Sequence, residues 1–204
     1  MAKDTVRGVS DPASAPRERR FDGVVLLLAM VVVMWALEAA DAIAPGTPFD
    51  RYGIEPRDPD SLPEVVTAPF LHVGFGHLIG NTIPLIAMGI VIALQGAKRL
   101  LLVTLIVIVV SGLGVWLIAP EGTTHLGASG IVFGYAAYLL TRGIFNRAPL
   151  ELAVGLAVAL IWGTALLGGL APQDGVSWQG HLFGAIGGVI AARVFATGRR
   201  RQPA

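Results

Sequence analysis

The sequence predicts an all-α, polytopic membrane protein, and its composition is the first reason. Of the 204 residues, 54% are hydrophobic and only 14% are charged, whereas a soluble domain of this size carries roughly 25% charged residues. The mean hydropathy is +0.68. The apolar residues fall in several runs of membrane-spanning length rather than in one anchor. We therefore expect a single membrane domain that contacts the lipid bilayer and binds no nucleic acid.

Six apolar stretches organise the chain. Residues 1–20 are polar and rich in Pro, Ser, Ala and Arg, which is typical of a disordered cytoplasmic tail. Residues 197–204 form a second, basic tail. The apolar stretches between the tails cover residues 21–40, 77–94, 100–118, 130–140, 150–167 and 176–195. They predict a bundle of six transmembrane helices.

The first stretch has an alternative interpretation as a secretory signal peptide. Basic residues precede it, and Ala42-Ile43-Ala44 resembles a cleavage site. Its length exceeds that of an ordinary signal-peptide core, so a retained span is favoured. The segment that follows, residues 41–76, is rich in proline and acidic residues but also holds an apolar Val65-Val66 pair. We expect part of it to lie in or on the membrane interface.

The distribution of basic residues predicts the topology. With six spans, both termini share one side of the membrane, and that side holds 13 of the 15 Lys and Arg residues. The other side holds only Arg51 and Arg57. Cytoplasmic loops carry the excess of basic residues. Both termini are therefore expected in the cytoplasm, with residues 41–76 and the loop before Ser129 on the outer side.

The fourth stretch is short. Eleven residues, 130–140, rise ~1.5 Å each and cover about half of the ~30 Å hydrocarbon core. A helix of this length that reaches the inner face would place Ser129 near the middle of the membrane. A loop at that depth is tolerated only where it lines protein or a watery cavity. We therefore expect Ser129 to be more than an ordinary N-cap.

Four polar residues are expected at one depth in the outer half of the membrane. His77 and Asn81 begin the second stretch one turn apart, Ser129 begins the fourth, and His181 lies near the start of the sixth. Polar groups at such a depth are costly and usually face partners inside the bundle. Their lateral adjacency does not follow from the sequence.

This set of residues suits acyl transfer. A serine hydroxyl becomes a nucleophile when a base removes its proton, and neutral histidine serves near pH 7. Backbone N–H groups at a helix start can stabilise the oxyanion, and Gly127 and Gly130 allow close backbone approach. The acidic residues Glu121 and Asp174 lie in loops, with nothing to place either beside His181. The simplest prediction is a Ser129–His181 dyad.

Two glycine patterns indicate how the dyad could form. Gly130 and Gly134 lie four residues apart in the fourth stretch, and Gly184 and Gly188 do so in the sixth. Small residues at this spacing allow transmembrane helices to approach closely. If these faces pack together, Ser129 and His181 come within reach of each other.

Together these residues resemble the rhomboid family of intramembrane serine proteases, over roughly residues 21–196. The resemblance implies a six-helix rhomboid-like bundle and transmembrane protein substrates, with no cofactor and no metal. The matching motifs are His72-xxxx-His77-xxx-Asn81, Gly127-x-Ser129-Gly130 and Gly180-His181-xx-Gly184-xxx-Gly188.

The resemblance also implies roles for individual residues. Ser129 is the expected nucleophile and His181 the general base. A larger group is expected to stabilise the oxyanion: His77, Asn81 and the backbone around Gly127, Ala128 and Ser129. His72 is expected to be structural, and Gly130, Gly184 and Gly188 to serve packing.

The sequence departs from the family pattern at two places. Rhomboids often have a Trp-Arg pair in the first loop, where this chain reads Pro63-Glu64-Val65-Val66. They often have a tyrosine four residues after the nucleophile, where this chain has Phe133. The phenylalanine ring is still expected to stack on the base.

Three alternative functions stay open. The chain could be a rhomboid-like pseudoprotease that binds transmembrane clients, although Ser129 and His181 are both present. A small transporter would place polar residues along a whole pathway. A metalloprotease using His72, His77 and His181 lacks the His-Glu-x-x-His pattern. We also expect His125 at the loop surface, Glu151 near the inner face either paired or snorkelling, and a bacterial plasma membrane as the location.

Overall fold

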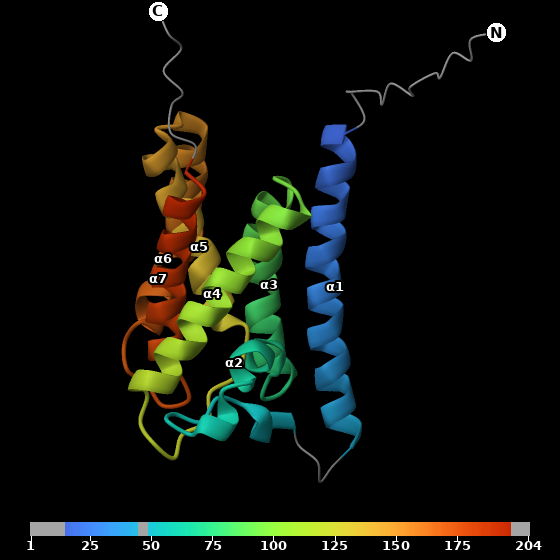
Figure 1. The fold of residues 1–204 in the computed structure, drawn as a ribbon, viewed down its shortest axis with the longest axis vertical. Coiled ribbons are helices and arrows are strands. Elements are labelled where there is room, and N and C mark those ends of the chain that lie inside the picture. Colours follow the sequence, from blue (N-terminus) through green and yellow to red (C-terminus); the bar gives the residue numbers. More distant parts are fainter. Residues whose placement is uncertain (1–14, 45–48, 197–204) are drawn as a thin grey trace, which may run out of the picture.

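The computed structural model describes residues 15–44 and 49–196, and all regular elements within these residues are helical. Figure 1 shows long helices running up and down, with the start of α1 and the end of α7 at the same end. The long helices are α1 (Ala15–Ile43), α3 (Phe75–Ala93), α4 (Ala97–Ile118), α5 (Ser129–Asn146), α6 (Pro149–Gly169) and α7 (Trp178–Val194). The prediction of an all-α protein is confirmed.

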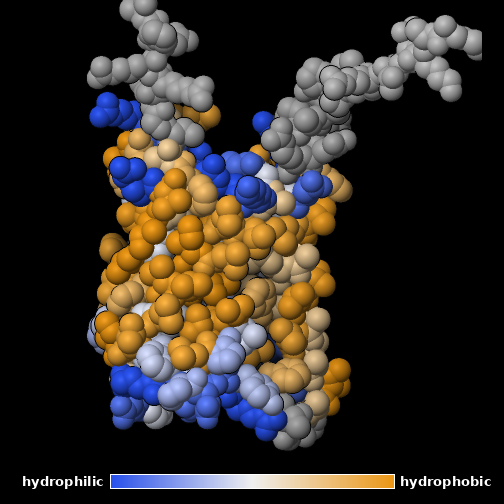
Figure 2. Space-filling view, viewed as in Figure 1, coloured by the Kyte–Doolittle hydropathy of each residue, from blue (hydrophilic) through white to orange (hydrophobic). Residues whose placement is uncertain are grey.

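Within residues 15–44 and 49–196, four helices are long and apolar enough to cross a membrane. They comprise residues 20–43 of α1 together with α3, α4 and α6. Figure 2 shows a broad hydrophobic band across the face in view, with hydrophilic residues at both ends. A bundle with such a band is stable only where lipid covers it. The chain is therefore an integral membrane protein.

Two boundaries differ from the prediction. Helix α1 begins at Ala15, so residues 15–20 are helical rather than part of a disordered tail. The reason is local: proline is tolerated in the first turn, and the Arg and Glu residues that follow favour helix. The rest of the two expected tails, residues 1–14 and 197–204, lies outside the described residues.

The second difference concerns α5, which has 18 residues and ends at Asn146. At ~1.5 Å per residue it is about 27 Å long, so the helix is longer than its apolar run, and the depth of Ser129 stays a prediction. Beyond the apolar run, Arg142 of this helix forms an ion pair with Glu151 of α6. Of the two alternatives expected for Glu151, pairing is thereby confirmed.

The hydrophobic core is built around α5. Residues 131–139 of this helix are all buried, and α5 packs against α3, α4, α6 and α7. Helix α1 packs against α3 and α4 and adds Leu27 and Met34 to the core. Helix α6 is peripheral, because only Gly155 and Val158 are buried in it. The start of α5 is thus held by neighbours on several sides.

Glycines bring α5 and α7 together. A Cβ atom on Gly184 would overlap the carbonyl oxygen of Gly130, and a Cβ atom on Gly188 would overlap that of Gly134. Only glycine allows backbones to pack this closely. The two glycine patterns of the sequence therefore face each other along the contact between α5 and α7.

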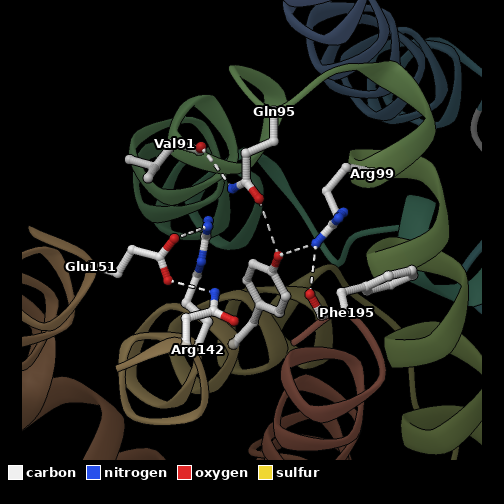
Figure 3. A network of polar contacts seen from close by, with 8 residues as sticks. Val91, Gln95, Arg99, Arg142, Glu151 and Phe195 are labelled. Atoms are coloured by element: carbon white, nitrogen blue, oxygen red, sulfur yellow. Dashed lines mark hydrogen bonds and ion pairs between the residues drawn. The ribbon is translucent and has the colours of Figure 1, made fainter. Parts of the chain in front are cut away.

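A polar cluster joins four helices at the upper end of Figure 1, and Figure 3 shows it from close by. We call it the Tyr138 network. The Tyr138 hydroxyl donates to Gln95 Oε1 at 3.3 Å and accepts from Arg99 Nη1 at 3.3 Å. Arg142, which lies near the Tyr138 ring, pairs with Glu151. The network links the helices to one another at the end of the bundle opposite Ser129.

The first long loop packs against the lower half of α4. It is a series of short turns: η1 (Phe49–Tyr52), η2 (Pro59–Ser61), α2 (Glu64–Thr67) and η3 (Ala68–Phe70). Val65 is buried, and a Cβ atom on Gly112 would lie 2.6 Å from Val65 Cγ1. Apolar contacts with α4 therefore anchor this part of the loop.

Candidate active site

Ser129 is the first residue of α5. In Figure 1 the yellow segment before α5 rises from the lower end of the molecule into the bundle. Backbone hydrogen bonds pin this segment to the first loop, because Ile54 and His125 exchange two of them (2.8 and 3.0 Å) and Gly127 N–H donates to Ala68 O at 2.9 Å. Ser129 itself is half-buried. Hydrogen bonds between the first loop and the segment before α5 thus fix the position of Ser129, the candidate nucleophile.

Gly127 creates the space beside Ser129. Its φ of +113° belongs to a region that favours glycine. A Cβ atom here would lie 2.6 Å from His77 Cε1 and 3.7 Å from Asn81 Nδ2. Gly127 lies two residues before Ser129. The structure therefore brings His77 and Asn81 of α3 close to the segment that leads into Ser129.

The two α3 residues differ in environment. His77 is exposed, whereas Asn81 is only 7% exposed. The Asn81 Nδ2 atom is buried and has no hydrogen-bond partner in the described chain. A buried amide without a partner costs about 1–3 kcal/mol. Such a donor is available to a ligand that enters the site.

His72 anchors the loop that precedes α5. It is 3% exposed, and its Nε2 accepts a hydrogen bond from Ala128 N–H at 3.3 Å. Burial, with a smaller contribution from His77, lowers the pKa of His72 to about 4. The ring is therefore neutral at pH 7, as an acceptor must be.

Ala128, one of the residues expected to stabilise the oxyanion, has its N–H bonded to His72 Nε2. The N–H groups of Ser129, Gly130 and Ile131 are free of partners within the described residues, because the first N–H groups of a helix have no intrahelical acceptor. The Ser129 N–H is the better backbone donor.

His181 lies one turn into α7 and is 8% exposed. Its ring stacks on Phe133 with the centroids 4.1 Å apart and an angle of 3° between the planes. This is the stacking that the sequence led us to expect. Its Nδ1 lies 2.7 Å from the carbonyl oxygen of Gly169. A carbonyl only accepts, so the proton is on Nδ1 and Nε2 is free to act as a base.

No hydrogen bond joins Ser129 Oγ to His181 in the described residues, but the packing brings the two residues close. Phe133, one turn after Ser129, stacks on the His181 ring. A Cβ atom on Gly130 would lie 3.3 Å from the carbonyl oxygen of Gly180, the residue before His181. Catalytic hydrogen bonds are often long in the absence of substrate.

A cavity at the start of α5 is lined by Ser129, and it is bounded by the first loop, α4, the segment before α5 and the start of α7. Its polar lining also includes Ser111, His125 and Ser177. Ser111 Oγ donates to Gly180 O at 2.8 Å. Sequence reasoning did not select Ser111, although a serine hydroxyl inside an otherwise apolar stretch was the available signal.

His125 is not the surface residue that we expected. It is half-buried, and its two ring nitrogens lie 2.8 Å from Thr123 Oγ1 and 2.8 Å from Ser177 Oγ. Burial lowers its pKa below the ordinary value. The loop folds over the start of α7 at this point, which sequence spacing alone did not indicate. His125 thus ties the segment before Ser129 to the helix that carries His181.

The comparisons with known proteins agree with this geometry. The model of the Rhomboid domain family matches residues 59–198, more than half of the chain. The chain belongs to the rhomboid family. Members of this family are usually intramembrane serine proteases, and the resemblance inferred from the motifs is thereby confirmed.

Several relatives of this rhomboid are bacterial. An uncharacterized protein of Mycobacterium tuberculosis, Rv1337, is 39% identical over 92% of this chain and 81% of its own length. An uncharacterized protein of Mycobacterium leprae, ML1171, is 38% identical over 92% of this chain and 77% of its own. The rhomboid protease GluP of Bacillus subtilis is 30% identical over 63% of this chain and 25% of its own length.

The histidines of this rhomboid do not form a metal site. In the described part of the chain, no three His, Asp or Glu side chains are grouped so as to hold a metal ion. His72 and His77 are neighbours, with ring centroids 5.1 Å apart, but His181 packs against Phe133 and Gly169 instead. The metalloprotease alternative therefore lacks a ligand set.

Proposed function

We propose that this rhomboid is an intramembrane serine endopeptidase that cleaves transmembrane protein substrates, with Ser129 as nucleophile and His181 as general base. One observation carries the proposal. The His181 ring is held between Phe133 and the Gly169 carbonyl with Nδ1 as the donor, beside the helix turn that begins with Ser129. A serine near a histidine with a free, oriented Nε2 is the arrangement that acyl transfer requires.

The proposed reaction has two steps. Ser129 Oγ attacks the peptide carbonyl carbon while its proton moves to His181 Nε2. The protonated ring then donates that proton to the leaving amine as the C–N bond breaks and an ester with Ser129 remains. In the second step His181 takes a proton from water, whose oxygen attacks the ester carbon. The protonated ring then returns this proton to Ser129 Oγ as the ester bond breaks and the carboxylic acid product leaves.

The oxyanion of each tetrahedral intermediate needs donors that are in place beforehand. The Ser129 N–H at the start of α5 is one, and the helix dipole favours negative charge there. The unpartnered Asn81 Nδ2 is the second, and His77, beside Gly127, is the third. In this proposal Ala128 contributes through its bond to His72, which fixes the loop.

We further propose that α5 and α7 also cross the membrane, giving six spans within residues 21–196. Both termini then face the cytoplasm, together with 13 of the 15 basic residues. The common end of α1 and α7 in Figure 1 supports this topology. The site then lies toward the outer face, and the mycobacterial relatives support a bacterial plasma membrane.

Purified protein in detergent, given a fluorescent transmembrane substrate, tests the proposal. The wild-type protein should cleave it, and both Ser129→Ala and His181→Ala should lose at least about 10³-fold in kcat. Thr141→Ala is a matched control, because it removes a hydroxyl from the far end of the same helix, where Oγ1 bonds only Ala137 O.

The thermal unfolding midpoints of these variants should stay close to that of the wild-type protein. Full activity in Ser129→Ala would overturn the mechanism. Binding of the substrate without any cleavage by the wild-type protein would instead support the pseudoprotease alternative.

A further inference from the structure

Helix α6 ends next to His181. The last carbonyl groups of a helix have no partner within the helix, and here each of the last three finds one. Leu167 O accepts from Leu170 N–H at 3.2 Å, and Gly168 O accepts from Ala171 N–H at 3.1 Å and from Gln173 Nε2 at 2.7 Å. Gly169 O has the His181 ring as its partner, at 2.7 Å. Only this last bond leads to another long helix.

We infer that the carbonyl group of Gly169 is the positioning group of the dyad, in the role that a carboxylate plays in a catalytic triad. This inference rests on the proposed function. The carbonyl keeps the proton on Nδ1 and points Nε2 away from α6. The partial negative charge at the end of a helix also stabilises the positive ring that forms during the reaction. No charged third residue has to be placed inside the membrane, where it would be costly.

The residue type at position 169 follows from this role. A Cβ atom on Gly169 would lie 2.7 Å from Phe133 Cζ and 3.1 Å from His181 Nδ1. It would push against both the stacked ring and the base. A Cβ atom on Gly168, one residue earlier in the same helix, would have no neighbour within 4 Å. The chain thus provides a pair of adjacent glycines of which only one contacts the site.

The packing of α6 against its neighbours also affects the orientation of the His181 ring. Only Gly155 and Val158 are buried in α6, and the helix packs mainly against α5. The acceptor for Nδ1 therefore lies on the most peripheral helix that contacts the site. A shift of the end of α6 away from α7 would remove the bond and release the ring.

Nuclear magnetic resonance of the wild-type protein tests the orientation without any activity measurement. The chain has four histidines, so ¹⁵N-histidine labelling gives few signals, and comparison with His181→Ala identifies those of His181. We expect His181 to be protonated on Nδ1 and unprotonated on Nε2 at about pH 7.5, where a neutral imidazole predominates. Protonation on Nε2, or an equal average of the two forms, would overturn the inference.

Kinetics of the glycine pair test the functional consequence. Gly169→Ala should lower kcat roughly 100-fold, the cost of misplacing a reacting group by about 1 Å. Its KM should be unchanged, because substrate binding does not involve the ring. Gly168→Ala should retain kcat and KM. Gly169→Ala should stay folded but unfold at a somewhat lower temperature than Gly168→Ala, because its Cβ atom crowds Phe133. Equal kcat in the two variants would contradict the inference.

The two measurements separate the inference from the proposed function. An Nδ1-protonated His181 in a protein that cleaves no substrate would overturn the proposed function and support the placement of the ring. A Ser129-dependent protease with His181 protonated on Nε2 would overturn the role of Gly169 and leave the protease in place.

Discussion

Polar side chains at the two ends of the bundle differ in how completely they are hydrogen-bonded. In the Tyr138 network, the hydroxyl of Tyr138 both donates and accepts, and both carboxylate oxygens of Glu151 have partners. Of its buried side-chain atoms, Arg142 Nε lacks a partner among the described residues. Around Ser129, the buried Asn81 Nδ2 has no partner in the described residues. Both clusters lie at the ends of an otherwise apolar structure.

We interpret the Tyr138 network as a cluster that stabilises the fold, and the polar residues around Ser129 as donors available to a ligand. An unsatisfied buried polar group costs about 1–3 kcal/mol, while a satisfied hydrogen bond contributes about 1 kcal/mol. The Tyr138 network therefore adds to stability, and the site lowers it. Substitutions at the two ends should accordingly have opposite effects on activity and on stability.

Asn81→Ala should give the largest effect of these comparisons. Removing one oxyanion donor costs about 10²–10³-fold in kcat. The unfolding midpoint should stay the same or rise, because the variant also removes an unpartnered buried amide. Steady-state kinetics and thermal unfolding in detergent measure both quantities. A loss of stability with unchanged kcat would make Asn81 a packing residue.

Acidification should lower the free energy of unfolding of the protein, because His72 must be protonated. Its folded-state pKa of about 4 lies below the ordinary value of 6.5, so the unfolded chain binds more protons between these values. The stability from neutral His72 is complete above pH 6.5 and is lost as the pH falls toward 4. The loss between about pH 7 and about pH 5 should be up to about 2 kcal/mol.

His72→Gln checks the acid effect, because glutamine can still accept from Ala128 N–H but does not titrate. Over the same pH range, the free energy of unfolding of this variant should fall less than that of the wild-type protein. The same pH dependence in both proteins would assign the effect to another group.

Tyr138→Phe should give the smallest effect. It removes the hydroxyl that links Gln95 to Arg99, and each such bond contributes about 1 kcal/mol. We expect a lower unfolding midpoint with unchanged kcat and KM. A fall in kcat at constant KM would show that the network communicates with the site, contrary to the separation described above.

The sequence predicted the helices better than the site. Apolar runs determine where membrane helices form, so the long helices and the facing glycines of α5 and α7 were accessible to sequence reasoning. The end of α5 was not, because the helix continues beyond its apolar run as far as Asn146. The start of α1 also differed, since charged residues can extend a helix beyond its apolar part.

Within the site, residue types indicated the chemistry but not the contacts. Ser129 and His181 were selected from motifs and expected depth. The bond from Ala128 N–H to His72 and the Gly169 carbonyl involve backbone atoms, which every residue carries and no motif identifies. His125 was taken for a surface residue because its partner Ser177 lies 52 positions away. Such contacts depend on how the loops fold over the helices.

Reaction with a serine-directed fluorophosphonate tests the central claim, that His181 activates Ser129, most directly. The wild-type protein in detergent should be modified at one residue, identified as Ser129 by mass spectrometry of the labelled peptide. Labelling should be absent in Ser129→Ala and at least about 10²-fold slower in His181→Ala. Equal labelling rates in the wild-type protein and His181→Ala, or modification of a different serine, would contradict the account.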